Sequence, residues 1–188
     1  MHLKTLEKEL LSRSLPERIQ FISSYFAGER LVFSTSFGQE DQAITQAIAS
    51  TKSPIDIFTL DTGRQFQESY ELMDLTIKKY GIPLKTFFPS TPAVEKLVAE
   101  KGFNSFYTSV ENRKECCFVR KMEPLSRALK GAKVWITGLR AEQSENRADM
   151  PILEWDESRQ LFKINPLIDW DFSTLEKYLT DHKIPQNP

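Results

Sequence analysis

The feature that most constrains the fold is a short apolar run followed by a polar loop and a helix-forming segment, which recurs along the chain. The apolar runs cover residues 31–36, 55–60, 84–88 and 133–137. Strands that alternate with helices in this way form a mainly parallel sheet with helices on both faces. We therefore expect an α/β fold with a doubly wound, mainly parallel sheet.

The segments between these runs have helical periodicity and recognisable ends. Ser14 is expected to cap the second helix, and Thr91 the helix that Pro92 enters. Residues 105–129 are also helical by pattern, with an interruption or bend near Pro124. Residues 152–155 and 161–164 predict a late hairpin. The other predicted helices cover residues 3–13, 14–27, 65–80, 91–102 and 171–182, with one more around Ala43–Ile48.

Length and composition indicate one globular domain over residues 1–188, with 40% hydrophobic and 27% charged residues. The formal net charge of −1 gives no general case for nucleic-acid or membrane binding, although local basic clusters can still bind an anion. The first ten residues have no apolar signal core, and no run approaches the roughly 20 residues of a membrane span. We expect a cytoplasmic protein.

Cys116 and Cys117 are the two cysteines of the chain, and Lys114, Arg120 and Lys121 surround them. They fit a pair of small apolar residues in a helix, whereas a disulfide between neighbours is strained. The cations favour a metal site, because they lower thiol pKa values and offset an anionic centre. The number of ligands argues against it, since such a site takes four and the histidines stand at opposite ends, His2 and His182.

The first strand runs into Ser34–Gly38, which offers hydroxyl groups and backbone N–H groups at the start of a helix. Such a loop suits phosphate or sulfate, although a serine-rich capping turn explains it equally well. The glycine fingerprints of triphosphate and dinucleotide sites are absent from the sequence. Glu40 and Asp41 stand where a triphosphate site prefers cations, which argues against ATP with magnesium.

Two further polar loops follow strands. Asp61–Arg64 provides an acid for a ribose or base and a cation for an oxyanion, although Asp-Thr-Gly is also a common turn. Arg140 and Arg147, with Gln143 and Ser144 between them, are the strongest anion-binding candidates, with a solvated surface loop as the alternative. Because the carboxyl ends of parallel strands share one sheet edge, we expect the three loops to converge.

Four segments together resemble the sulfonucleotide reductases in order and spacing: residues 34–42, 60–63, 115–125 and 135–144. Within that family, the double cysteine resembles the assimilatory adenosine 5′-phosphosulfate reductases that carry a [4Fe-4S] cluster. The resemblance implies an adenine nucleotide alpha-hydrolase-like fold. It also implies reduction of adenylyl sulfate to sulfite and AMP with thioredoxin as the electron donor, and a possible homo-oligomer.

The resemblance also implies roles for individual residues. Cys116 and Cys117 are expected to be two of the four cluster ligands, with Lys121 near both cluster and substrate. The expected substrate-binding residues lie in the three strand-end loops: Ser34, Thr35, Ser36, Phe37, Gly38, Gln39, Glu40, Asp41, Leu60, Asp61, Thr62, Gly63, Arg64, Gly138, Leu139, Arg140, Gln143, Ser144 and Arg147.

In the family, a Cys-x-x-Cys pair and a nucleophilic cysteine in a Glu-Cys-Gly-x-His-like tail follow a Pro-x-Asn-Pro-like segment. The chain ends at Pro185–Pro188, so we expect a C-terminally truncated reductase that lacks turnover alone and has an absent or incomplete cluster. Three alternatives stay open: a 3′-phosphoadenylyl sulfate reductase without a cluster, an ATP-dependent adenylyl transferase or amidating pyrophosphatase on the same fold, and a non-catalytic adenine-nucleotide-binding module.

Overall fold

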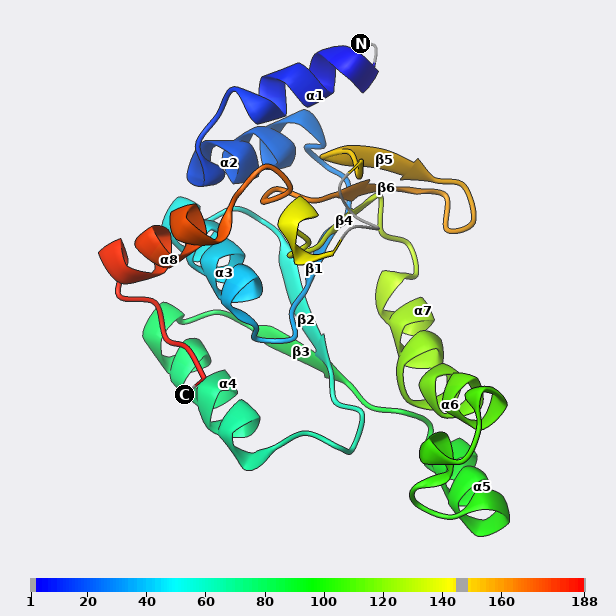
Figure 1. Cartoon of the computed structure of the whole chain (residues 1–188). Helices are drawn as coiled ribbons and strands as arrows, with labels where there is room; N and C mark the ends of the chain where they lie inside the picture. The colour runs from blue at the N-terminus through cyan, green and yellow to red at the C-terminus, as the bar shows by residue number, and fades with distance from the viewer. Residues whose placement is uncertain (1–2, 145–148, 188) are drawn as a thin grey trace.

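A six-stranded sheet with the strand order β3-β2-β1-β4-β6-β5 organises the fold (Figure 1). The computed structural model describes residues 3–144 and 149–187. Every strand pair is parallel except β5 with β6, which form the predicted hairpin. The expected doubly wound, mainly parallel sheet is confirmed. Its strands are β1 (Leu31–Ser34), β2 (Asp56–Leu60), β3 (Leu84–Phe87), β4 (Val134–Ile136), β5 (Leu153–Asp156) and β6 (Leu161–Ile164).

Helices cover both faces of the sheet. In Figure 1, α1 to α4 and α8 lie on one side and α5 to α7 on the other. Within residues 3–144 and 149–187, no helix is long and apolar enough to cross a membrane. The helices are α1 (Leu3–Leu11), α2 (Leu15–Tyr25), α3 (Gln39–Thr51), α4 (Gln67–Tyr80), α5 (Thr91–Lys101), α6 (Val110–Cys117), α7 (Glu123–Leu129) and α8 (Phe172–Asp181).

The central strand β1 is buried on both faces, as expected for a parallel sheet between two helical layers. Leu31 and Phe33 belong to the larger core cluster, which includes residues of α1, α2, α3 and α8. Val32 points to the other face and packs with Phe58 and Leu129, beneath α7. The alternation along β1 therefore joins the two cores.

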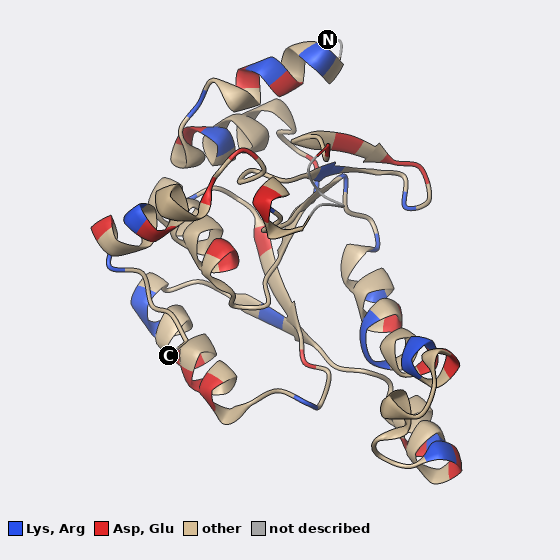
Figure 2. Cartoon of the chain, in the orientation of Figure 1, with Lys and Arg blue, Asp and Glu red and all other residues tan. Residues whose placement is uncertain are grey.

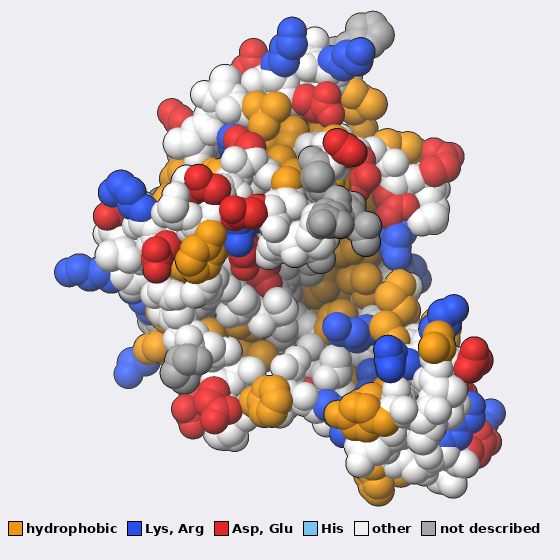
Figure 3. Space-filling view, in the orientation of Figure 1, with side chains coloured by type: hydrophobic (Ala, Val, Ile, Leu, Met, Phe, Trp, Pro, Cys, Tyr) orange, Lys and Arg blue, Asp and Glu red, His pale blue; other side chains and the backbone are white. Residues whose placement is uncertain are grey.

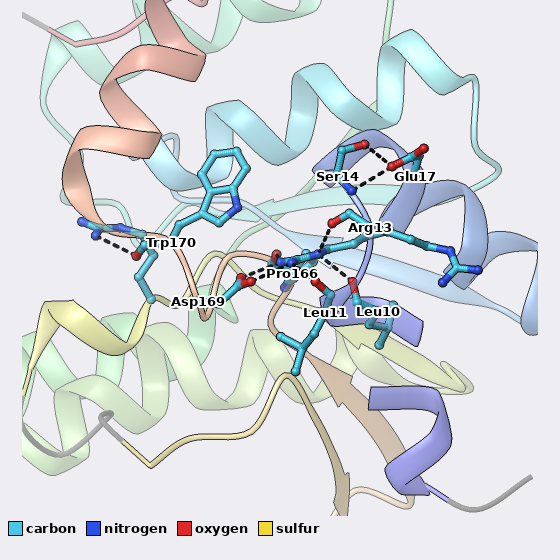
Figure 4. Close-up of polar contacts among 10 residues, drawn as sticks. Leu10, Leu11, Arg13, Ser14, Glu17, Pro166, Asp169 and Trp170 are labelled. Atoms are coloured by element: carbon cyan, nitrogen blue, oxygen red, sulfur yellow. Dashed lines mark hydrogen bonds and ion pairs between the residues drawn. The ribbon is translucent and has the colours of Figure 1, made fainter. Parts of the chain in front are cut away.

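A buried arginine ties α2 to the segment between β6 and α8 (Figure 4). Arg18 is 3% exposed and forms hydrogen bonds of 2.6 and 2.7 Å with the two carboxylate oxygens of Asp169. It also donates to the carbonyl oxygens of Leu10 at 2.9 Å and Pro166 at 2.6 Å. At the start of α2, the Glu17 carboxylate accepts the backbone N–H of the expected cap residue, Ser14.

The predicted element boundaries need small corrections. The first strand ends at Ser34, two residues earlier than predicted. The N-cap of α5 is Ser90, which has extended backbone angles, so the assignment of Thr91 as the cap is wrong. The helix α4 ends at the predicted Gly81, which adopts the left-handed conformation with φ of 62°.

The predicted helical stretch 105–129 is broken into several pieces. A short 3₁₀ turn, η1 (Ser105–Tyr107), precedes α6, and a π-helical segment, η2 (Phe118–Met122), joins α6 to α7. The backbone N–H of Glu123 donates to the carbonyl oxygen of Phe118, five residues back. Pro124 has no N–H to donate to an α-helical hydrogen bond. The irregular turn therefore lies just before Pro124, where the interruption was predicted.

Candidate functional site

The boundary between β1 and β4 is a topological switch point, where ligands bind in open α/β sheets. The chain leaves β1 through α3 on one face and enters β4 from α7 on the other. A cleft of about 630 Å³ lies here, visible as the central hollow of Figure 3. Described residues that line it are Ser34, Thr35, Ser36, Gly38, Glu40, Asp41, Phe58, Leu60, Thr62, Gln65, Lys121, Leu125, Trp135, Thr137, Gly138, Leu139, Gln143 and Lys163.

The loop after β1 turns sharply before α3 begins. Phe37 adopts a left-handed φ of 62° and buries its ring against Leu72 and Met73 of α4, away from the cleft lining. Gly38 is the N-cap of α3 and lines the cleft. Gln39 is exposed and hydrogen-bonds Gln186 at 2.8 Å. Phe37 and Gln39 therefore hold the loop through contacts outside the described cleft lining.

The Asp41 carboxylate accepts hydrogen bonds from two donors of this loop. It accepts the backbone N–H of Ser36 at 2.6 Å and the Ser36 hydroxyl at 2.8 Å. These groups were predicted to bind phosphate or sulfate, but in this structure they bind an internal anion. Burial raises the pKa of Asp41 to about 6, although the two hydrogen bonds from Ser36 lower it.

Gly138, in the loop after β4, approaches the Asp41 side chain very closely. A Cβ atom on Gly138 would lie 2.1 Å from Asp41 Oδ1 and 3.2 Å from the Glu40 Cβ. No side chain fits there unless the buried Asp41 side chain leaves its position or the loop moves. Glycine is therefore required at position 138 for its size, and Asp41 joins the loops after β1 and β4.

The loop after β2 contributes only part of its predicted residues. Leu60 and Thr62 line the cleft, whereas the Asp61 carboxylate accepts the Gly63 N–H and the Tyr70 hydroxyl, each at 2.8 Å. Asp61 is thus used to shape the turn.

Arg64, in the same loop, extends away from the cleft. Its guanidinium donates to the Phe103 carbonyl at 3.0 Å and to the Asn104 side chain at 2.8 Å. It also lies 4.8 Å from the centroid of the Phe106 ring. In this structure Arg64 connects the β2 loop to the η1 region rather than to the cleft.

Arg140, the strongest predicted anion-binding residue, is buried and already paired. Its Nε donates to Glu40 and its NH1 to Glu142, both at 2.8 Å, and it is absent from the described cleft lining. Arg147, predicted to bind the anion together with Arg140, lies outside the described residues. Ser144 is exposed and does not line the cleft. From this loop, the cleft receives Gly138, Leu139 and Gln143.

The π-helical segment η2 closes the opposite wall. Lys121 lines the cleft. The preceding residue, Arg120, is buried and donates to the Thr62 carbonyl at 2.6 Å. Arg120 therefore fixes η2 against the β2 loop, with Lys121 beside it facing the cleft. Figure 2 shows the basic residues along the α6–α7 side of the molecule.

Cys116 and Cys117 lie at the end of α6, next to η2 but outside the described lining of the cleft. Both thiols are free, with Cys116 partly buried and Cys117 exposed. The described residues contain no group of three or more His, Cys, Asp or Glu side chains that would hold a metal ion. Adjacent thiols beside cations fit the chemistry of an iron–sulfur cluster, but such a cluster takes four ligands and the described residues offer two thiols here.

Six cleft residues were not predicted. Trp135 and Lys163 are register neighbours on β4 and β6, and the Trp135 indole N–H donates to Ser34 Oγ at 2.9 Å. The alternation of side chains along a strand could have predicted that each of them faces one side of the sheet. The sequence does not show that β4 and β6 are neighbours, and only this strand order brings the two side chains together at the cleft. The full set is Phe58, Gln65, Leu125, Trp135, Thr137 and Lys163.

Comparison with known proteins relates the chain to one family of reductases. Residues 30–188 match the phosphoadenosine phosphosulfate reductase domain. The chain is 46% identical over 184 residues to a protein named adenosine 5′-phosphosulfate reductase from Agrobacterium fabrum, covering 98% of this chain and 70% of that protein.

Solved structures point the same way. The crystal structure of a phosphoadenylyl-sulfate reductase from Candida auris matches with a TM-score of 0.82 and 30% identity, over 99% of this chain and 88% of that one. An NH₃-dependent NAD synthetase from Campylobacter jejuni matches with a TM-score of 0.61 and 9% identity, over 98% of this chain and 75% of that one, and so shares the fold.

Proposed function

Because the chain belongs to the phosphoadenosine phosphosulfate reductase family, we propose that it reduces adenosine 5′-phosphosulfate to sulfite and AMP in sulfate assimilation. The observation that carries this proposal is the cleft at the switch point between β1 and β4. Loops from β1, β2 and β4 line it together with Lys121 of η2. A bound nucleotide would therefore contact both helical layers through the sheet edge.

The chemistry of the lining suits a nucleotide with a negatively charged arm. Leu60 and Leu125 offer apolar surface for a base, and the side chains of Thr62 and Gln65 are partly exposed polar groups in the same lining that suit a ribose. Lys121 supplies a cation with no ion pair among the described residues, so it remains available for phosphate or sulfate oxygens. We propose that the phosphosulfate arm lies toward Lys121.

The proposed reaction is a two-electron reduction. A thiolate attacks the sulfate sulfur, the bond from sulfur to the bridging oxygen breaks, and AMP leaves with both electrons of that bond. A second thiolate then attacks the thiol-derived sulfur of the resulting S-sulfonate, the bond from that sulfur to the sulfonate group breaks, and sulfite leaves with the electron pair as a disulfide forms. We propose thioredoxin as the dithiol donor and the cytoplasm as the compartment. Neither Cys116 nor Cys117 is in the described cleft lining, so neither is assigned as the attacking thiolate.

We further propose that Cys116 and Cys117 are two of the four thiolate ligands of a [4Fe-4S] cluster. Both are reduced in this structure and lie one helical turn from Lys121. When bound, the cluster would supply an anionic iron–sulfur centre beside the site. Lys121 would then balance negative charge on both the cluster side and the substrate side.

Calorimetric titration tests the proposed nucleotide site. AMP and adenosine 5′-phosphosulfate are expected to bind one per chain, and Lys121→Gln is expected to weaken both by about tenfold, because it removes the free cation. Lys177→Gln, a charge change on the distant helix α8, is the matched control and should leave both affinities unchanged. Tight ATP binding with no AMP binding would contradict the proposal.

A second candidate is reduction of the 3′-phosphorylated nucleotide. The resemblance to the Candida auris structure, whose name contains phosphoadenylyl sulfate, favours it. The paired cysteines favour the first candidate, because the cluster-free branch is not expected to keep both. Sulfite release from each of the two nucleotides, with thioredoxin as reductant, distinguishes them.

A further inference from the structure

The charged side chains of the cleft lining are balanced. The described lining includes two lysines, Lys121 and Lys163, and two acids, Glu40 and Asp41. Glu40 is paired with Arg140 behind the wall at 2.8 Å. Asp41 accepts only uncharged donors, from Ser36, among the described contacts.

Lys163 is the lining cation that the predictions did not include. It belongs to β6, and its side chain is 15% exposed. Its Nζ donates to Glu154 Oε1 at 2.8 Å, and the two residues face each other in the antiparallel register of β5 and β6. Because the strand register holds both backbones, this pair has less entropy to lose than a flexible surface pair.

The neighbours of Lys163 keep it in the cleft wall. Its Nζ lies 6.0 Å from the Trp135 ring centroid, and the Trp135 indole N–H is bound to Ser34. The other cation near this ring, Arg159, is paired with Asp156 at 2.8 Å. Both of these cations beside the Trp135 ring are therefore paired with carboxylates.

Lys121 on the facing wall is different. It is exposed and has no ion pair in residues 3–144 or 149–187. The cleft thus presents one available cation on the η2 side and a neutralised cation on the β6 side. This arrangement suits a nucleotide whose negative charge is concentrated on one arm.

We propose that the Glu154–Lys163 pair is a specificity determinant, which selects a nucleotide with one anionic arm over one with a second phosphate on the ribose. This inference rests on the proposed function, because it assumes that an adenine nucleotide occupies the cleft. A second phosphate adds almost two negative charges. Glu40 and Asp41 are in the described lining of the same cleft, so a second phosphate would meet their negative charge without a free cation on the β6 side.

Glu154→Gln tests the proposal directly, since it frees Lys163 with little change of shape. The probes are AMP and adenosine 3′,5′-bisphosphate, measured by calorimetry at low and high salt. We expect the variant to bind the bisphosphate roughly fivefold more tightly relative to AMP than the wild-type chain does. The gain should shrink at high salt, because it is electrostatic.

Two further variants separate this role from a structural one. Glu154→Gln combined with Lys163→Gln should return the ratio of the two affinities to the wild-type value, since the pair is neutral again. Asp181→Asn removes one carboxylate from the Lys177 pair on α8 and should leave the ratio unchanged. A general loss of structure would weaken both nucleotides together and would not move the ratio.

The outcomes distinguish failure of the specificity role from failure of the proposed function. If the wild-type chain binds AMP and Glu154→Gln leaves the affinity ratio unchanged, the pair does not set specificity, while the proposed function stands. An equal shift in Asp181→Asn would also overturn the inference, because it would point to net charge alone. If the wild-type chain binds neither nucleotide, both the inference and the proposed function fail.

Discussion

The two walls of the cleft are built in different ways. On the sheet side, Gly138 lies against Asp41, Asp41 accepts the Ser36 N–H, and Glu40 is paired with Arg140 behind the wall. On the helical side, the lining residue Lys121 is exposed, and just outside the described lining Cys117 is exposed and Phe118 is 61% exposed. One wall is therefore a packed part of the fold, and the other presents reactive and apolar groups to solvent.

This difference predicts a division of labour. Changes in the sheet-side wall should cost stability and binding together, because the same contacts hold the loops and shape the cleft. Changes at the cysteines should affect ligand chemistry with little effect on folding, because few contacts are lost there. Four substitutions, in order of decreasing expected effect, test the comparison.

Arg140→Met should produce the largest effect. It removes the buried guanidinium and leaves Glu40, whose side chain is 16% exposed, without its partner. Loss of one member of a buried pair costs about 3 kcal/mol or more in the free energy of unfolding. Urea denaturation measures it. Arg127→Met, in an exposed pair on α7, is the control and should cost less than about 1 kcal/mol. Equal losses would mean that the sheet-side wall is not specially packed.

Gly138→Ala should be next. The added Cβ meets Asp41 Oδ1 at 2.1 Å, so the Asp41 side chain must give up its hydrogen bonds with Ser36 or the loop must move. Overpacking of this kind costs typically 1–3 kcal/mol, and we expect AMP binding to be lost as well. Gly38→Ala on the same wall is a matched control for stability, because its φ is −64° and its Cβ finds ordinary contacts at 3.8 Å. A larger loss of stability in Gly38→Ala than in Gly138→Ala would contradict the steric explanation.

The pKa of Asp41 predicts an unusual pH dependence. It is raised to about 6 by burial, so the folded state takes up a proton below pH 6 that the unfolded state takes up only near pH 4. The contribution of this group to stability should therefore rise by up to roughly 3 kcal/mol as the pH falls from 6 to 4. In Asp41→Asn, measured by urea denaturation across this range, that component should vanish.

Asp56 provides a control of opposite sign. Its pKa is lowered, first by the hydrogen bond from Lys85, so its contribution to stability is lost as the pH falls through the lowered value. Asp56→Asn should therefore remove a component that declines in acid. If the curves of wild-type protein and Asp41→Asn stay parallel from pH 4 to 6, Asp41 is not the buried acid that the structure indicates.

Cys117→Ser should have the smallest effect on folding, within about 0.5 kcal/mol, because the thiol is exposed. Its effect should instead appear in iron content after anaerobic reconstitution with iron and sulfide, which should fall below that of the wild-type chain. Ser126→Ala on the neighbouring helix α7 serves as a control and should leave iron content unchanged. Equal iron binding by Cys117→Ser and wild-type protein would argue against a ligand role.

Much of the fold follows from local patterns. The apolar runs predicted the parallel strands and the hairpin, and helix-end signals such as Gly81 and Asp171 lie at the ends of α4 and α8. These features depend on neighbouring residues, so the chain encodes them locally. The loops that line the cleft were also predicted, because the carboxyl ends of parallel strands meet at one edge.

Side-chain partners could not be predicted in the same way. Arg140 and Arg64 were expected to bind an anion, yet they contact Glu40 and the backbone of Phe103, residues about 100 and 39 positions away. An arginine in a polar loop looks the same in sequence whether its partner is a ligand or a distant carboxylate. Only the packed structure decides which one is within reach.

The sequence by itself determined the order of the elements, the strand-end position of the loops and the adjacent thiols with their cations. The tertiary structure decided which groups are available to a ligand. It placed Asp41 on the donors of Ser36, and it placed Lys163 in the cleft opposite Lys121. These outcomes depend on strand order, register and the approach of Gly138, which bring together segments that are far apart in the chain.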